Sequence, residues 1–191
     1  MKPIIWLVAT LLIAIAPQTL ASAQTFTKKE AKELINTPVY NPVTKSYFEL
    51  VVIGPGYSIR GNAPEAHWSI AYKLAKSRRF HGVRGRLAVI KDAKTNAFLR
   101  DTFHLRRKAW FGLRYWCSVR KLQWVTREFH TRRDYNNWDN PWDESANGCN
   151  SSTAPYLAAA YLPFKDGFRW FVHTTVKEYT RMFVEYQTGK E

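Results

Sequence analysis

Both segments that can form amphipathic helices lie before residue 104, and the segments after them favour strands. The first helix is predicted to begin near Pro64, because proline fits a first turn, and to stop near Gly82. The second is predicted from Asp92, a good capping residue, to Phe103. Its inward stripe is predicted from apolar side chains at helical spacing: Ala93, Ala97, Leu99 and Phe103. Helices early and antiparallel strands late indicate the α+β class.

Short segments rich in β-branched and aromatic residues are predicted to form strands. They are residues 46–53, 87–90, 110–113, 122–125, 156–162, 168–174 and 182–186. Residues 126–155 show few helix or strand signals. A loop this long in a compact domain is usually functional or disordered, so we expect it to carry the function.

This long loop, residues 126–155, gathers carboxylates and amides in a chain with a formal net charge of +14. Such a charge favours anionic partners, unless it only keeps the protein soluble. Carboxylates crowded on one loop repel one another unless a cation or an arginine lies among them. One interpretation is a calcium site, and the other is a solvated loop whose side chains cap turns. Hard oxygen ligands are offered by Asp139, Asn140, Asp143, Glu144, Asn147 and Asn150.

The chain is predicted to have three parts. Residues 1–23 are typical of a secretory signal peptide, with Lys2, a short apolar run and small residues at Ala21 to Ala23. Residues 24–45 are predicted to be a loose N-terminal arm, and residues 46–191 a single domain. We therefore expect a secreted or periplasmic protein without a membrane span.

Two cysteines, Cys117 and Cys149, are present in the chain. An even pair in an exported protein predicts one disulfide, which would tether the base of the long loop. Asn150-Ser151-Ser152 is a glycosylation sequon, which matters only in a eukaryotic secretory pathway.

No catalytic pattern stands out, so we expect a binding protein rather than an enzyme. The histidines are scattered and form no HExxH spacing, and the serines lie in no nucleophile elbow. The histidines are His67, His81, His104, His130 and His173. No cofactor is expected, apart from the calcium considered above.

Several motifs, in order from about Tyr47 to Tyr186, resemble those of the C-type lectin-like domain. They are Trp68 with Ala71, Asn96-Ala97-Phe98-Leu99, Trp110-Phe111-Gly112-Leu113, Tyr135-Asn136-Asn137-Trp138 and Phe183-Val184-Glu185-Tyr186. The resemblance implies two helices, antiparallel sheets and a long loop that recognises a ligand. It also implies that Trp138 anchors the loop on the core.

The chain departs from the sugar-binding members of that family. Those members bind calcium through Glu-Pro-Asn or Gln-Pro-Asp in the loop and Trp-Asn-Asp on a strand. Here the loop has Asn140-Pro141-Trp142-Asp143, and the strand has Trp170-Phe171-Val172 after Arg169. The family's disulfide between the first helix and the last strand is missing as well, with Ala75 in the helix position. We therefore expect no usual calcium motif, and elements held by packing alone.

The favoured hypothesis is carbohydrate or glycoconjugate binding through the long loop. The predicted ligand-binding residues are Trp142, Asp139, Asn140, Asp143 and Glu144, and the metal candidates are Asp139, Asp143 and Glu144. The alternative is a protein- or polyanion-binding domain of the same fold without sugar recognition. Basic clusters at the predicted helix ends favour the alternative, unless they only complement the helix dipoles. They are Arg78, Arg79, Arg84 and Arg86, and then Arg100, Arg106, Arg107 and Lys108.

Overall fold

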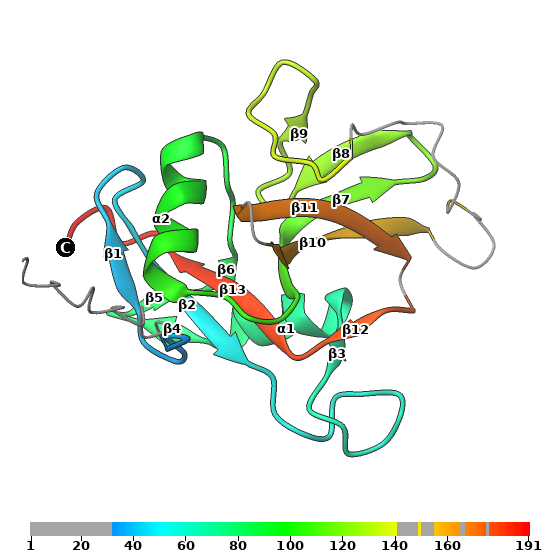
Figure 1. Ribbon diagram of the computed structural model, residues 1–191, viewed down its shortest axis with the longest axis horizontal. Helices are drawn as coiled ribbons and strands as arrows, with labels where there is room; N and C mark the ends of the chain where they lie inside the picture. Colours follow the sequence, from blue (N-terminus) through cyan, green and yellow to red (C-terminus); the bar gives the residue numbers. More distant parts are fainter. Residues whose placement is uncertain (1–31, 141–148, 150–154, 165–166, 175) are drawn as a thin grey trace, which may run out of the picture. The chain divides into compact units, whose positions relative to one another are not determined.

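The structure is a computed structural model that describes residues 32–140, 149, 155–164, 167–174 and 176–191 (Figure 1). Its main sheet has the strand order β1-β2-β13-β7-β10-β11. The bounds are β1 Val39–Asn41, β2 Ser46–Val52, β13 Arg181–Tyr186, β7 Ala109–Trp116, β10 Tyr156–Phe164 and β11 Gly167–Thr174. Its strands pair antiparallel along this path, except that β13 and β7 are parallel.

Short strands complete this sheet and form two small ones. In the main sheet β6 (Arg86–Leu87) pairs with β13, β8 (Lys121–Trp124) with β7, and β9 (Phe129–His130) with β8. The pairs β3 (Ala66–His67) with β12 (Glu178–Tyr179), and β4 (Arg79–Phe80) with β5 (Val83–Arg84), stand apart. The helices are α1 (Trp68–Ser77) and α2 (Ala93–Phe103). Two helices with mixed sheets confirm the α+β class.

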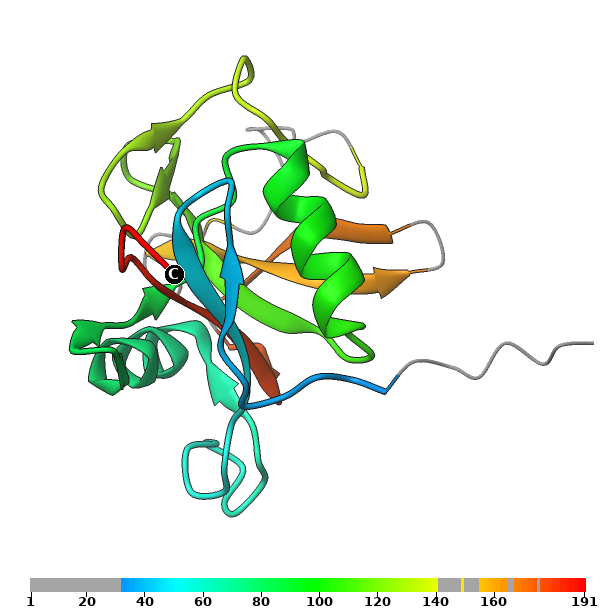
Figure 2. The same ribbon diagram turned by 90° about the vertical axis from the view of Figure 1, so that its left-hand side faces the viewer.

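The two helices cover opposite faces of the sheet (Figure 2). Alternation along β7 shows why, since successive side chains of a strand point to opposite faces. Phe111 and Leu113 belong to the core cluster that contains Leu99 of α2. Trp110 belongs to the second cluster, which contains Trp68 of α1. The loop and α2 thus share one face, and α1 occupies the other.

The predicted α1 begins too early. Ala66 and His67 pair with Tyr179 and Glu178 of β12, so the backbone there is extended and the helix starts at Trp68. The helix ends at Ser77 rather than at Gly82, which lies in the turn between β4 and β5 with φ of +76°. A distant strand overrides the local helix signal of Pro64.

The predicted α2 has the correct bounds but only half of the correct stripe. The Asp92 side chain accepts a hydrogen bond from the Thr95 amide at 2.7 Å, as a capping residue does. Leu99 is buried as predicted, but Ala93 is exposed. Asn96 is buried instead, and its Oδ1 accepts a hydrogen bond from the Tyr161 hydroxyl at 2.8 Å. A polar residue enters the core because a partner on β10 satisfies it.

The other predicted strands are confirmed except residues 87–90, where β6 covers only Arg86–Leu87 and residues 88–90 form no strand. Two further segments also differ from expectation. Val39–Asn41, within the segment predicted to be a loose arm, forms β1 and pairs with β2. Phe129–His130 forms β9 within the long loop and pairs with β8. Strands of two or three residues are too short for their hydrophobic pattern to predict them from the sequence.

Neither of the two helices seen in the described segments is long and apolar enough to cross a lipid bilayer.

A polar network joins α1 to the sheet, which corrects the prediction that packing alone does so. Arg78 follows α1, and its guanidinium donates to both carboxylate oxygens of Glu49 on β2, with Nε 3.1 Å from Oε2. Its Nε also lies 3.2 Å from the Tyr186 hydroxyl on β13. That hydroxyl donates to Glu49. Burial, followed by this hydrogen bond to a carboxylate, raises the pKa of Tyr186 to about 12.

The predicted disulfide is confirmed. Cys117 and Cys149 are bonded, and their Cα atoms lie 5.4 Å apart. Cys117 directly follows β7, and its amide donates to the Pro155 carbonyl just before β10. The bond therefore ties the second half of the long loop to the end of β7.

Candidate functional site

The first half of the long loop is anchored on β11. The Asp139 amide donates to the Trp170 carbonyl at 2.8 Å, and the Trp170 amide donates to the Asn137 carbonyl at 2.8 Å. The Trp138 ring meets the Trp170 ring edge-on, with centroids 5.4 Å apart. Trp138 thus packs on the core, which confirms its predicted anchoring role.

The usual calcium motif of a sugar-binding lectin does not fit these residues. Phe171 and Val172 stand where oxygen ligands would be required, and their side chains carry none. Arg169, beside them, donates from Nη1 to Asn137 Oδ1 at 3.0 Å. This amide oxygen therefore already accepts a hydrogen bond from a positively charged group. Within the part of the chain that the structure describes, no three His, Cys, Asp or Glu side chains come together as metal ligands.

The structure describes only part of the predicted ligand set. Asp139 and Asn140 are both exposed, directly after the anchored Trp138. Trp142, Asp143 and Glu144 lie outside the described residues. The contribution of these three side chains, and of calcium bound among them, therefore remains a prediction.

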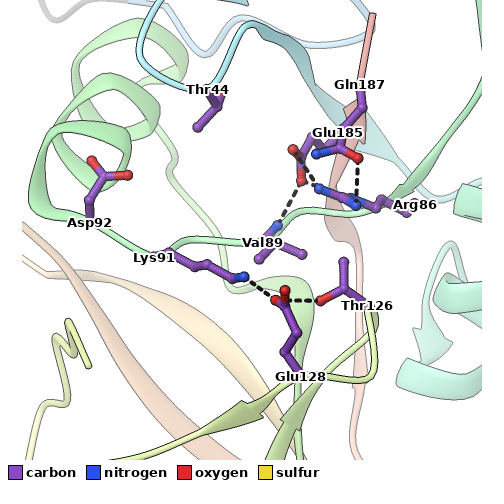
Figure 3. Close-up of a pocket in the computed structure, with 9 residues that line it drawn as sticks. All are labelled: Thr44, Arg86, Val89, Lys91, Asp92, Thr126, Glu128, Glu185 and Gln187. Carbon is purple, nitrogen blue, oxygen red and sulfur yellow. Dashed lines mark hydrogen bonds and ion pairs between the residues drawn. The ribbon is translucent and has the colours of Figure 1, made fainter. Parts of the chain in front are cut away.

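Two adjoining hollows lie where the long loop begins. The larger is a cleft of about 420 Å³ (Figure 3), lined by Thr44, Arg86, Val89, Lys91, Asp92, Thr126, Glu128, Glu185 and Gln187. The smaller, of about 220 Å³, is lined by Lys91, Trp124, Glu128, Phe129, His130 and Asp134. Lys91 and Glu128, which form an ion pair, line both hollows.

The inner wall of the cleft contains the buried carboxylate of Glu185, which accepts several hydrogen bonds from the protein itself. Glu185 accepts two hydrogen bonds from the Arg86 guanidinium, at 2.9 and 3.1 Å. It also accepts from the Val89 amide at 3.0 Å and from the Ser46 hydroxyl at 3.2 Å. Glu185 lies on β13, and its donors come from β6, from the segment just after β6 and from the start of β2. Glu185 therefore fixes the shape of the cleft and has little capacity left for a ligand.

At the outer rim of the cleft, an ion pair between two side chains is exposed enough for a ligand to replace it. Lys91 and Glu128 pair across it (Figure 3), and both side chains are about half exposed. The hydrogen bond from Lys91 lowers the pKa of the Glu128 carboxyl. Exposed ion pairs contribute little to stability, so a ligand can replace the contact at small cost. The rim offers a donor and an acceptor side by side, which suits hydroxyl groups because these both donate and accept.

The smaller hollow adds an aromatic surface. Phe129 is 51% exposed, and Lys121 Nζ lies 5.1 Å from the centroid of its ring. Asp134, which also lines this hollow, accepts from the Thr131 amide at 2.7 Å and from the Thr131 hydroxyl at 2.9 Å, and these bonds lower the pKa of its carboxyl. An apolar surface next to fixed polar groups is typical of small-molecule sites.

The hollows also use residues that the sequence analysis did not assign to the loop site. Arg86, Lys91, Asp92 and Glu185 come from strands and a helix cap far from the loop in sequence. The lining residues that belong to the predicted functional loop are Thr126, Glu128, Phe129, His130 and Asp134. The carboxylates of Glu128 and Asp134 are the sequence signal for this end of it.

The basic clusters at the helix ends are partly used inside the protein. Arg78 pairs with the buried Glu49, and Arg86 with the buried Glu185. Arg100 pairs with Asp101 on the surface. These pairings neutralise three of the eight cations in the two clusters.

We predict that the protein loses stability as the pH falls below about 6.5, in part through His130. Burial lowers the pKa of His130 below its ordinary 6.5, although the Asp134 charge opposes this. The unfolded chain then takes up a proton before the folded chain does, so unfolding is favoured as pH falls. Urea midpoints at pH 7.5 and 5.5 should differ less for His130→Gln than for the unsubstituted protein. An equal pH dependence of the two proteins would contradict this assignment.

Comparisons with known proteins agree with this architecture. Residues 75–162 match the family model of the lectin C-type domain. No curated protein sequence matches the chain. The carbohydrate-recognition domain of cow CD23, solved with a GlcNAc2Man3 oligosaccharide, is similar with a TM-score of 0.53. It is 18% identical, over 78% of this chain and 92% of that one.

Two further solved structures are similar at 14% identity and a TM-score of 0.51. One is SPL-2 from Saxidomus purpuratus, a Ca²⁺-independent C-type lectin, with 75% of this chain and 87% of that one covered. The other is SPL-1 in complex with GlcNAc, with 75% and 88% covered. The family match, the strand order and the two helices lead to one conclusion: this chain has the C-type lectin-like fold.

Proposed function

We propose that this protein binds carbohydrate or glycoconjugate through the long loop and the two hollows at its start, without the usual calcium motif. C-type lectin domains commonly bind carbohydrate and are generally binding modules rather than enzymes. The observation that carries the proposal is the pair of adjoining hollows, the smaller of which is lined by Phe129 together with the charged side chains of Lys91, Glu128 and Asp134. The similarity to a Ca²⁺-independent lectin supports the calcium-free part.

Recognition follows from the chemistry of the rim. Sugar hydroxyls would accept from the Lys91 ammonium and donate to the carboxylates of Glu128 and Asp134. The apolar face of a sugar ring would pack against Phe129, since aromatic rings offer a rigid apolar surface. Asp139, Asn140 and the further predicted contacts continue the site along the loop: Trp142, Asp143 and Glu144.

The proposal includes export of the protein. C-type lectin domains are typically extracellular, and residues 1–23 have the features of a secretory signal peptide. An oxidising compartment is also where the disulfide between Cys117 and Cys149 would persist.

Binding to a glycan array, with and without a chelator, tests the function. We expect Phe129→Ala and Trp142→Ala each to weaken binding by roughly five- to tenfold, the effect of losing one aromatic contact of about 1 kcal/mol or more. The chelator should leave binding unchanged. The matched control is Tyr57→Ala, which removes an exposed aromatic outside the loop.

Three results would contradict the proposal in different ways. If the unsubstituted protein bound no glycan, the proposed function would be wrong. Loss of binding in chelator would reject the calcium-free mechanism and favour ligands such as Asp139, Asp143 and Glu144. Equal binding by Phe129→Ala, Trp142→Ala and Tyr57→Ala would show that the loop does not take part in glycan binding.

A further inference from the structure

Arg114, on β7, is a partly buried arginine. It forms no hydrogen bond or ion pair with any residue described in the structure, and its Nε is buried. By contrast, Arg78, Arg86 and Arg181 each pair with a buried or nearly buried carboxylate. A buried N–H group without an acceptor is uncommon in folded proteins and calls for an explanation, such as a ligand.

Aromatic rings hold the Arg114 side chain in place. Its guanidinium carbon lies 4.0 Å from the centroid of the Trp116 ring, 5.3 Å from that of Trp68 and 5.9 Å from that of Tyr156. Burial lowers the pKa of the guanidinium, but an arginine remains charged at neutral pH. The rings stabilise this cation through their π faces and provide no hydrogen-bond acceptor for its N–H groups.

The surroundings of Arg114 are poor in negative charge and rich in further donors. Arg114 and His173 are both register partners of Ala158, so the two side chains emerge on the same face, on either side of a methyl group. His173 Nε2 is also buried without a partner among the described residues, and it can donate in one tautomer of the neutral ring. Lys76 lies over the ring of Tyr72, which stacks on Trp68. This combination favours a negatively charged ligand.

This cluster is separate from the hollows at the loop. Trp68 and Ala158 belong to the core cluster on the α1 face of the sheet, whereas Trp170 and Trp138 pack on the other face. A ligand at Arg114 would therefore approach β7 from the side opposite the anchored loop.

We propose that Arg114 anchors a second binding site, which takes an oxyanion carried on a sugar, either a sulfate or a carboxylate. The planar guanidinium matches the oxygens of both groups and can donate two parallel hydrogen bonds to them. The partly exposed rings of Tyr72, Trp116 and Tyr156 supply apolar surface for the sugar that carries the charge. Acidic glycans have both features.

Calorimetric titration of the exported protein tests this site at one fixed salt concentration. The probes are a sulfated heparin oligosaccharide, an unsulfated oligogalacturonate and neutral dextran, which distinguish sulfate from carboxylate. We expect Arg114→Gln to weaken binding of the acidic probe about 10- to 100-fold, the range for one charge-assisted contact. Arg107→Gln is the matched control, because Arg107 is an exposed arginine just before β7.

Two further variants make the result decisive. Arg114→Lys keeps the charge but loses the planar fork, so we expect a loss at least fivefold larger than for Arg107→Gln even if Arg114→Gln folds poorly. Tyr57→Ala, which removes an exposed aromatic outside both sites, should leave binding of the acidic probe unchanged. The proposal is overturned if the Arg114 variants and Arg107→Gln weaken binding equally, or if neither acidic probe binds better than dextran.

Discussion

Glu49→Ala is expected to lower the free energy of unfolding by about 2–4 kcal/mol, because it leaves a half-buried arginine and a buried hydroxyl without their acceptor. The Glu49 side chain is 2% exposed and accepts from Arg78 and Tyr186. Breaking a fully buried pair costs about 3–5 kcal/mol, and the estimate is reduced here because the Arg78 side chain is 36% exposed. Urea denaturation followed by tryptophan fluorescence measures the change.

The control for this prediction is Glu128→Ala. Glu128 also pairs with a cation, Lys91, but its side chain is 57% exposed, so we expect a loss below about 1 kcal/mol. Hydrogen exchange should further show that α1 opens more readily in Glu49→Ala, because Arg78 connects its end to β2 and β13. Equal losses in the two variants would show that this network does not replace the family's missing disulfide.

Removing the disulfide with Cys117→Ala and Cys149→Ala together is expected to cost about 3–4 kcal/mol. The two cysteines are 32 positions apart, and closing a loop of this size restricts the unfolded chain. Thermal melting of the double variant should match that of the unsubstituted protein in reductant. It should also show weaker glycan binding, since the second half of the loop loses its attachment to β7.

A different result would separate stability from function. An unchanged melting temperature would mean that the native contacts around Cys117 already restrict the chain without the bond. Unchanged glycan binding despite the lost stability would mean that the hollows near Glu128, and not the tethered half of the loop, determine affinity.

Local signals account for the elements that the sequence predicted well. The capping carboxylate of Asp92 needs only the amide three residues later, so the start of α2 is encoded locally. The alternating residues of β11 similarly predict that Phe168 and Trp170 share the core face. The two cysteines left only one pairing, which is why the disulfide was predictable.

Contacts between distant segments account for what the sequence did not predict. Ala66 and His67 are extended because β12 pairs with them, although Pro64 favours a helix there. Asn96 is buried because Tyr161 satisfies it. The cleft exists because Glu185 gathers Arg86 and the Val89 amide around one carboxylate. None of these partners lies within a turn of helix or a hairpin of the residue that it affects.

The sequence by itself determined the α+β class, the two helices, the disulfide and the position of the long loop, because periodicity and capping act over a few residues. Only the tertiary structure decided which charges are paired inside the protein and which remain available. Arg78 and Arg86 meet buried carboxylates, whereas Arg114, among the residues that the structure describes, meets aromatic rings and no carboxylate. The three arginines look alike in the sequence, and their roles differ because desolvation and partners are set by the packing around each one.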